Sequence, residues 1–246
     1  MESRRLTAKK CSLKEIHEGR FVKKQGFESS YVLTNLGRRL SRVRIMGIVV
    51  DKFVRPDDKY ATITIDDGTE TIRCKSFINV KIFNDIIPGF LVEVFGRIRE
   101  YNDEIYIIPE IITKPDTNFE TLRKLELEKI YREQKQKIAK INELRKQSSD
   151  IEELKSLAKD FMSPEDVESI IEAEDIIKTE IEEKTVEKIE AKDKILKLIE
   201  NSLDGIKYNE IIEKSGLDEN KVDQVIQDLL ESGICFEPKP GLIKKL

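Results

Sequence analysis

Cations and aromatic rings share one side of two segments that alternate like β-strands. The members of this set are Arg73, Lys75 and Phe77 in the segment TIRCKSF, and Arg97, Arg99 and Tyr101 in the segment GRIREY. Alternate residues of a strand point to the same face, so each group of three lies on one face. Cations can pair with phosphates, and rings can stack on bases, which contributes about 1 to 3 kcal/mol per base in single-strand sites. The pattern therefore predicts a face that binds single-stranded nucleic acid.

Two neighbouring segments extend this face. Arg42 and Arg44 alternate with apolar residues in RVRIMGIVV, and Tyr60 opens the alternating segment KYATITI. The apolar residues between them are small or branched, which suits a barrel interior. The alternative is an ordinary solvated face, on which Arg and Lys serve solubility and Tyr covers an apolar rim. Because cations and rings recur on three or four neighbouring strands, we favour the binding face.

Five strands and one short helix are predicted in residues 38–115. The strands are RVRIMGIVVDKFV, KYATITI, TETIRCKSF, FLVEVFGRIREY and EIYIIPEII. An Asp-Gly pair at 67–68 predicts a tight hairpin between the second and third strands. Ile78, Ile82 and Ile86 lie at helical spacing and predict a short helix between the third and fourth strands. This order predicts a five-stranded OB-fold β-barrel, whose outer face commonly binds oligonucleotides.

A long helix is predicted over residues 116–147, directly after the barrel. Its start can be capped by Thr117 or Asn118. Its leading apolar residues are Phe119, Leu122, Leu125 and Ile130. A small barrel cannot cover a stripe of this length, so we expect the stripe to pack against a helix of another subunit. Docking on the chain's own N-terminal extension is the alternative.

The distribution of charge sets two segments apart. The chain carries a formal net charge of −4, but residues 148–190 hold 15 acidic and 5 basic residues, whereas residues 1–37 hold 8 basic and 4 acidic ones. We interpret 148–190 mainly as an acidic linker that is partly helical from Ser163 onwards. The basic extension at 1–37 and the excess of cations before the linker suit a polyanionic partner.

Residues 191–246 predict a compact C-terminal domain in a multidomain α+β protein. Three helical patterns, AKDKILKLIENS, KYNEIIEKSG and DENKVDQVIQDLLESG, precede two short strands. This order predicts a winged helix, which usually places its third helix in the DNA major groove. Here the third helix is acidic, with Lys221 as its single cation, so it would repel phosphates. We therefore favour a winged helix that binds proteins, although its basic hairpin leaves contact with DNA open.

The sequence contains no pattern typical of catalysis or metal binding. Its three cysteines are Cys11, Cys74 and Cys235, all isolated, and His17 is its single histidine. There is no P-loop, nucleophile elbow or metal-ligand spacing, so we expect neither an enzyme nor a bound cofactor. We see no signal peptide and no apolar run of membrane-spanning length, and we expect a cytoplasmic protein.

This layout resembles the middle, small OB-fold subunit of replication protein A, and its archaeal relatives most closely. The stretch ESSYVLTNLGRRLSRVRIMGIVV, residues 28–50, looks like the extension and first barrel strand of those archaeal proteins. The resemblance implies that Phe77 and Tyr101 stack on bases, with Lys75 as the basic residue beside the first ring. Two departures are a Phe at 77, where the eukaryotic subunit has Trp, and the acidity of the linker.

The resemblance also implies a non-enzymatic function within a heteromeric complex. The protein would coat single-stranded DNA in replication, repair and recombination. The 116–147 helix would join a bundle with other subunits of the complex, and the winged helix would recruit DNA-processing proteins.

Two other functions are compatible with the sequence. An adaptor would bind proteins through the barrel and winged helix, with no affinity for bare oligonucleotides. A regulator would bind duplex DNA through residues 191–246, although the acidic third helix counts against it. Within the favoured function, rings and cations fit RNA as well as DNA.

Overall fold

The chain folds into two compact units. The computed structural model describes residues 6–24, 29–77, 79–202 and 204–246. The first unit is Met1–Asp175 and the second is Ile176–Leu246. Each unit has a buried apolar core of its own.

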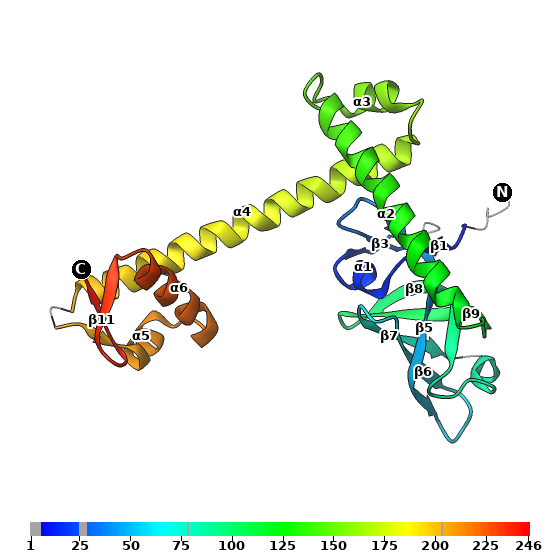
Figure 1. Cartoon of the computed structure of the whole chain (residues 1–246), viewed down its shortest axis with the longest axis horizontal. Helices are drawn as coiled ribbons and strands as arrows, with labels where there is room; N and C mark the ends of the chain where they lie inside the picture. The colour runs from blue at the N-terminus through cyan, green and yellow to red at the C-terminus, as the bar shows by residue number, and fades with distance from the viewer. Residues whose placement is uncertain (1–5, 25–28, 78, 203) are drawn as a thin grey trace. The chain divides into compact units, whose positions relative to one another are not determined.

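A closed β-barrel forms the centre of the first unit (Figure 1). Its strands are β5 (Arg42–Val54), β6 (Ala61–Asp66), β7 (Thr71–Ser76), β8 (Leu91–Tyr101) and β9 (Glu104–Thr113). The hydrogen-bonded order is β5-β6-β7-β9-β8, and β8 also pairs with β5, which closes the barrel. The predicted five-stranded barrel followed by a long helix is confirmed.

Side chains alternate along these strands as predicted. The interior contains, among others, Val43, Ile45, Ile63, Ile65, Ile72, Cys74, Val92, Val94 and Ile98, all of which are buried. Arg73 and Lys75 take the opposite parity to Ile72 and Cys74, and so point outwards from β7. The parity of the sequence therefore identified the outward side chains of β7 correctly.

The segment between β7 and β8 contains less helix than the sequence predicted. A single 3-10 turn, η1 (Val80–Phe83), takes the place of the expected short helix. Its Phe83 side chain fills the barrel core together with Ile86. Ile78, which contributed to the helical spacing, lies outside the described residues. Filling the end of the barrel, and not helical periodicity, explains these apolar residues.

The N-terminal extension packs on the barrel. Its elements, with the strand that follows it, are β1 (Lys9–Lys10), α1 (Leu13–His17), β2 (Arg20–Val22), β3 (Tyr31–Leu33) and β4 (Arg39–Leu40). Strand β1 pairs in parallel with β5, and β2, β3 and β4 form a small antiparallel sheet. Cys11, Leu13 and Ile16 belong to the barrel core. The extension is therefore an integral part of the folded barrel unit.

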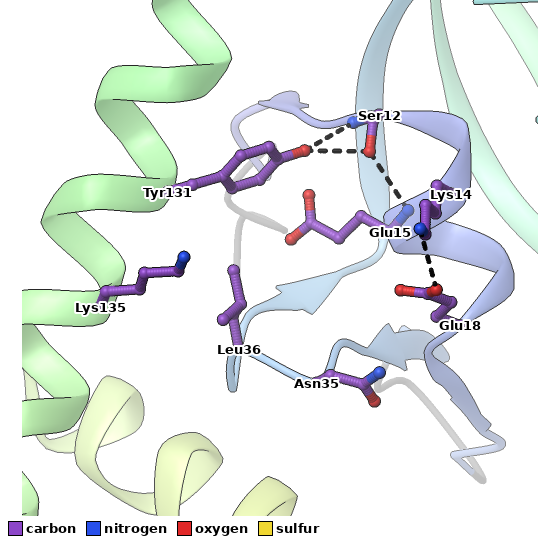
Figure 2. A pocket seen from close by; sticks show the side chains of 8 residues that line it. All are labelled: Ser12, Lys14, Glu15, Glu18, Asn35, Leu36, Tyr131 and Lys135. Atoms are coloured by element: carbon purple, nitrogen blue, oxygen red, sulfur yellow. Dashed lines mark hydrogen bonds and ion pairs between the residues drawn. The ribbon is translucent and has the colours of Figure 1, made fainter. Parts of the chain in front are cut away.

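Helix α2 (Asn118–Leu144) lies against β5 and the extension. Arg123 donates a hydrogen bond from Nη1 to the carbonyl oxygen of Arg44, 3.0 Å away, and Gln134 donates from Nε2 to the carbonyl oxygen of Leu36 at 2.8 Å. Figure 2 shows a third link, in which the hydroxyl of Tyr131 lies against Ser12. One side of α2 is thus occupied within this unit, as the docking alternative anticipated.

Residues 148–175 are more ordered than an acidic linker. They form α3 (Ile151–Ala158) and the first part of α4 (Pro164–Glu200). Leu154, Val167 and Ile170 are buried there in a cluster with Ile141 of α2. The expectation of a linker over 148–190 differs from the structure here because these few apolar residues lie at helical spacing among many charges. A low average hydrophobicity does not show where such residues gather on one face.

The second unit combines the last part of α4 with two helices and a three-stranded sheet. The elements are β10 (Ile206–Lys207), α5 (Tyr208–Ser215), α6 (Glu219–Glu231), β11 (Cys235–Lys239) and β12 (Leu242–Lys245). The antiparallel sheet has the order β10-β12-β11. Ile195, Ile211, Val222 and Leu229 are buried in its core. The three predicted helices and the hairpin are present, and β10 was too short to predict.

Candidate nucleic-acid interface

Five outward side chains form a line across the barrel. Phe53 of β5 lies opposite Thr62 of β6, and Thr62 lies opposite Lys75 of β7. The Nζ of Lys75 lies 4.6 Å from the ring centroid of Tyr106 in β9. Tyr106 in turn lies opposite Arg99 of β8. The line thus contains two rings and two cations, with the hydroxyl of Thr62 between Phe53 and Lys75.

Four aromatic rings, which we call the ring row, follow the same surface. The row consists of Phe53, Tyr60, Phe77 and Tyr106. Consecutive ring centroids lie 6.4, 5.3 and 6.4 Å apart. Phe53 and Phe77 are 50% and 52% exposed. The exposed faces of Phe53 and Phe77 can take bases upon them.

Two of these four rings were not singled out from the sequence. Phe53 has the parity of the inward residues Val43 and Val49, but a β-bulge between Val49 and Asp51 shifts the register of β5 and turns Phe53 outwards. Tyr106 alternates with the buried Ile107, and that parity was available in the segment EIYIIPEII. The bulge carries no local signal, whereas the alternation of β9 would have identified Tyr106.

Lys75 and Arg73 converge on one carboxylate beside the ring row. Lys75 Nζ lies 2.6 Å from Glu104 Oε2, and Arg73 Nη1 lies 3.2 Å from Glu104 Oε1. The hydrogen bond from Lys75 is the main cause that holds the pKa of Glu104 below its usual range. The two cations predicted for phosphate binding are therefore adjacent to the rings, and both contact an acid in the free protein.

Arg42 and Arg97 are brought together away from the ring row. Their Nε atoms lie 2.6 and 2.8 Å from the two oxygens of Glu110 on β9. Hydrogen bonds from the two guanidinium groups outweigh burial, which alone would raise the pKa of Glu110, and the net effect is a lowered pKa. The structure gives these two arginines a shared partner and no contact with the four rings.

Arg44 serves a different part of the fold. Its Nε and Nη2 donate to Glu93 at 2.6 and 3.0 Å, and its guanidinium lies 4.9 Å from the centroid of Phe95. Arg123 of α2 contacts the same carboxylate. Arg44 therefore belongs to the contact between α2 and the barrel, because the helix covers this part of the strand face. The expectation that all six cations share one open face is wrong in this respect.

Tyr101 stands apart from the ring row. It is 68% exposed at the end of β8, opposite Glu104 in register. Within the described residues it makes no ring contact with the four members of the row. It lies next to Glu104, on the far side of that acid from Lys75.

An apolar stripe marks the first turns of α2. Phe119, Leu122 and Leu125 are 50%, 48% and 59% exposed, and Ile111 of β9 is also exposed. Ile130 is half-buried, so it contributes less to this stripe than predicted. Beyond Leu125 the outer side of the helix carries charged residues such as Lys129 and Arg132. The stripe that can meet another subunit is therefore confined to the start of α2.

A separate cavity of about 410 Å³ lies between α1 and α2. Figure 2 shows Tyr131 from α2 reaching across it to Ser12. Lys14 and Glu18 pair at 3.5 Å on its rim, and burial raises the pKa of Glu15, although Arg38 lies within hydrogen-bond distance of its carboxylate. The polar groups of this cavity largely satisfy each other and hold the extension against α2.

Residues 43–115 match the family model of an OB-fold nucleic acid binding domain. The match covers the barrel strands and not the helices that follow. It agrees with the strand order found here and confirms the predicted OB fold.

A relative over nearly the whole chain comes from Methanocaldococcus jannaschii. It is the uncharacterized protein MJ1654, which is 30% identical over 236 residues and aligns with 94% of this chain and 86% of its own length. The chain belongs to the same family as this archaeal protein. The alignment extends over both units of this chain.

Replication protein A is among the solved structures with a similar fold. One is a replication protein A heterotrimer bound to single-stranded DNA, with a TM-score of 0.43 and 15% identity over 52% of this chain and 98% of that chain. Another is yeast replication protein A bound to single-stranded DNA, with a TM-score of 0.41 and 23% identity over 53% of this chain and 94% of that chain.

Neither a metal-ligand cluster nor a membrane-spanning helix is found in the part of the chain that the structure describes. The described residues contain no group of three or more His, Cys, Asp and Glu side chains that could hold a metal ion. They also contain no helix long and apolar enough to cross a membrane.

Proposed function

We propose that this protein binds single-stranded DNA on the barrel surface that carries the ring row. The observation that supports this most is the line Phe53, Thr62, Lys75, Tyr106 and Arg99, which crosses all five strands. The family model for OB-fold nucleic acid binding matches this same part of the chain. Both point to a polyanion with flat bases.

The chemistry divides between rings and cations. Phe53 and Phe77 each present about half of their surface to solvent, so bases can stack on them without unfolding the barrel. Lys75, Arg73 and Arg99 lie beside the rings and can neutralise phosphates, with the release of counterions. Stacking tolerates every base, so we expect little sequence preference.

We further propose that the protein acts as a subunit of a replication protein A-like complex. Phe119, Leu122 and Leu125 would pack against helices of other subunits, because an exposed apolar stripe on an otherwise charged helix is typical of such a contact. The role of the complex would be to protect single strands in replication, repair and recombination, in the cytoplasm. This part of the proposal rests on the resemblance of the sequence.

The second unit would recruit DNA-processing proteins as a winged helix. Its α6 pairs Lys221 with Glu187 at 3.0 Å and Asp228 with Lys188 at 2.6 Å, so its one cation already has an acidic partner. A helix with this charge would repel a DNA backbone. We therefore propose that α6 contacts proteins and that duplex DNA is not its ligand.

The test is fluorescence anisotropy of a labelled oligothymidine, beside a duplex of equal length, at several salt concentrations. We expect preference for the single strand and weaker binding as salt rises. The double variant Phe77→Ala with Tyr106→Ala should lose about 2 kcal/mol or more, or roughly thirtyfold in affinity. Phe161→Ala is the matched control, since Phe161 is 62% exposed and lies outside the barrel strands.

The outcomes separate this proposal from the adaptor. Absence of binding to any oligonucleotide, with the protein folded, would contradict the proposal and favour an adaptor that uses the stripe on α2. Binding that the ring variants leave intact would contradict the assignment of the face. The basic extension at residues 1–37 would then be the next site to examine.

A further inference from the structure

Glu104 lies where a phosphate of the bound strand would be expected. Its two oxygens accept from Lys75 Nζ at 2.6 Å and from Arg73 Nη1 at 3.2 Å. Two cations that converge on one pair of oxygens form the arrangement that recognises carboxylate or phosphate in proteins. In the free protein the chain's own carboxylate occupies it.

The neighbouring hydroxyl of Thr62 lacks a partner. Thr62 is 9% exposed, and its Oγ1 makes no hydrogen bond within the described residues. It lies directly opposite Lys75 in the strand pairing, on the outward face of β6. Buried polar groups are nearly always hydrogen-bonded, and an exception calls for a partner supplied from outside. Because Oγ1 is itself buried, a phosphate oxygen held by Lys75 reaches it only when Lys75 or a neighbouring side chain shifts aside.

We propose that Lys75, Arg73 and Thr62 form a phosphate-binding site within the ring row, which the Glu104 carboxylate fills in the free protein and a phosphate of single-stranded DNA takes over on binding. This inference rests on the proposed function. In this proposal Glu104 competes with the phosphate for Lys75 and Arg73. The hydroxyl of Thr62 has no hydrogen-bond partner among the described residues of the free protein and donates to the phosphate in the complex.

The exchange has a consequence for the rings as well. Lys75 Nζ lies 4.6 Å from the centroid of Tyr106 while it contacts Glu104. If Lys75 follows a phosphate outwards, the face of Tyr106 becomes free for a base. Release of Glu104 and stacking on Tyr106 are therefore coupled through the position of one ammonium group.

The first variant is Glu104→Gln, measured by anisotropy with labelled oligothymidine on the full chain. We expect roughly threefold to tenfold tighter binding, because the competing ion pairs with Lys75 and Arg73 are lost and a negative charge leaves the site. Glu110→Gln is the charge-matched control, since Glu110 pairs with Arg42 and Arg97 away from the rings. The gain for Glu104→Gln should clearly exceed that of the control.

The second variant is Thr62→Val, which removes the hydroxyl and keeps the branched shape. We expect binding to weaken about threefold or more, while the melting temperature stays equal or rises, because a buried hydroxyl without a partner is replaced by a methyl group. A purely structural role for Thr62 would lower the melting temperature instead. Weaker binding together with an equal or higher melting temperature would identify Thr62 as a hydroxyl that contacts the ligand.

A neutral backbone distinguishes phosphate from base recognition. With oligothymidine that carries methylphosphonate linkages, the advantage of Glu104→Gln over wild type should disappear. If wild type binds, the ring variants weaken binding and neither Glu104→Gln nor Thr62→Val has the expected effect, this inference is overturned and the proposed function stands. If wild type does not bind the oligonucleotide at all, both are overturned.

Discussion

Arg123 of α2 reaches the carboxylate of Glu93 on β8, and both side chains are almost completely buried, at 6% and 9% exposure. Arg44 contacts the same carboxylate from β5. One acid thus joins a helix to two strands that are neighbours in the barrel. The cluster explains why α2 keeps a fixed position on the barrel although its N-terminal turns expose apolar residues.

Removal of one member of this cluster should lower the free energy of unfolding. Glu93→Gln removes the buried carboxylate from Arg123 and leaves the more exposed Glu126 as its acidic contact, so we expect a loss of about 3 kcal/mol in the free energy of unfolding. Chemical denaturation measures it. The exposed pair of Lys124 and Glu120 is the control, since Glu120→Gln should change stability by about 0.5 kcal/mol or less. Equal effects of the two variants would contradict the structural role of Glu93.

The same carboxylate makes stability depend on pH. Burial raises the pKa of Glu93, but the hydrogen bond from Arg44 and the charge of Arg123 outweigh it, and the net pKa lies below the usual range. An unfolded Glu titrates near its ordinary value of about 4.3, so between the two values the unfolded state binds more protons. The stabilisation is fully present above the ordinary pKa and is lost as pH falls through the lowered one.

Unfolding in urea from pH 7 down to pH 3 tests this dependence. The difference in unfolding free energy between wild type and Glu93→Gln should shrink in the acidic part of the range. A difference that stays constant down to pH 3 would contradict the lowered pKa, because it would mean that Glu93 binds protons equally in the folded and the unfolded states. Glu110 and Glu126 also have lowered pKa values and add to the slope in the same direction.

The N-terminal extension should be needed for the stability of the barrel. Leu13 is fully buried in the barrel core, so Leu13→Ala should cost about 2 to 5 kcal/mol. Leu6 is half exposed, and Leu6→Ala should have an effect within about 0.5 kcal/mol. Thermal unfolding of both variants checks this. A stable, folded barrel made of residues 38–115 alone would contradict it.

The two groups of cations should behave differently towards single strands. Lys75→Gln should reduce the slope of log affinity against log salt by about 0.7, as expected when one phosphate contact is lost. Arg97→Gln should leave the slope close to wild type, because Arg97 is engaged with Glu110 and touches none of the four rings. Salt titrations by anisotropy give both slopes. If both variants reduced the salt slope equally, Arg97 would also contact phosphates of the bound strand.

The sequence predicted those features that depend on local alternation and turn chemistry. The outward direction of Arg73 and Lys75 follows from a period of two, and the hairpin at 67–68 follows from its Asp-Gly pair. Local signals of this kind need no knowledge of the partner strand.

Features that depend on distant partners could not be predicted in this way. The bulge that turns Phe53 outwards arises from the pairing of β5 with β6. The acids that form ion pairs with Arg42, Arg44 and Arg97 lie on other strands, 13 to 68 residues away in the sequence. Parity shows that a cation points outwards, but not which acid lies beside it on the curved surface. The sequence therefore predicted a single basic face where the structure has separate ion-paired clusters.

The contact between Ser12 and Tyr131 spans 119 residues of chain. A ribosome adds about 5 to 20 residues per second, so the partner of Ser12 is made roughly 6 to 24 seconds after Ser12 itself. Leu13 and Ile16 of α1 can pack in the barrel core as soon as the barrel strands have been made. The link from Ser12 to α2 is therefore completed only after strands β5 to β9 have been synthesised, and the extension is fixed against α2 late in translation.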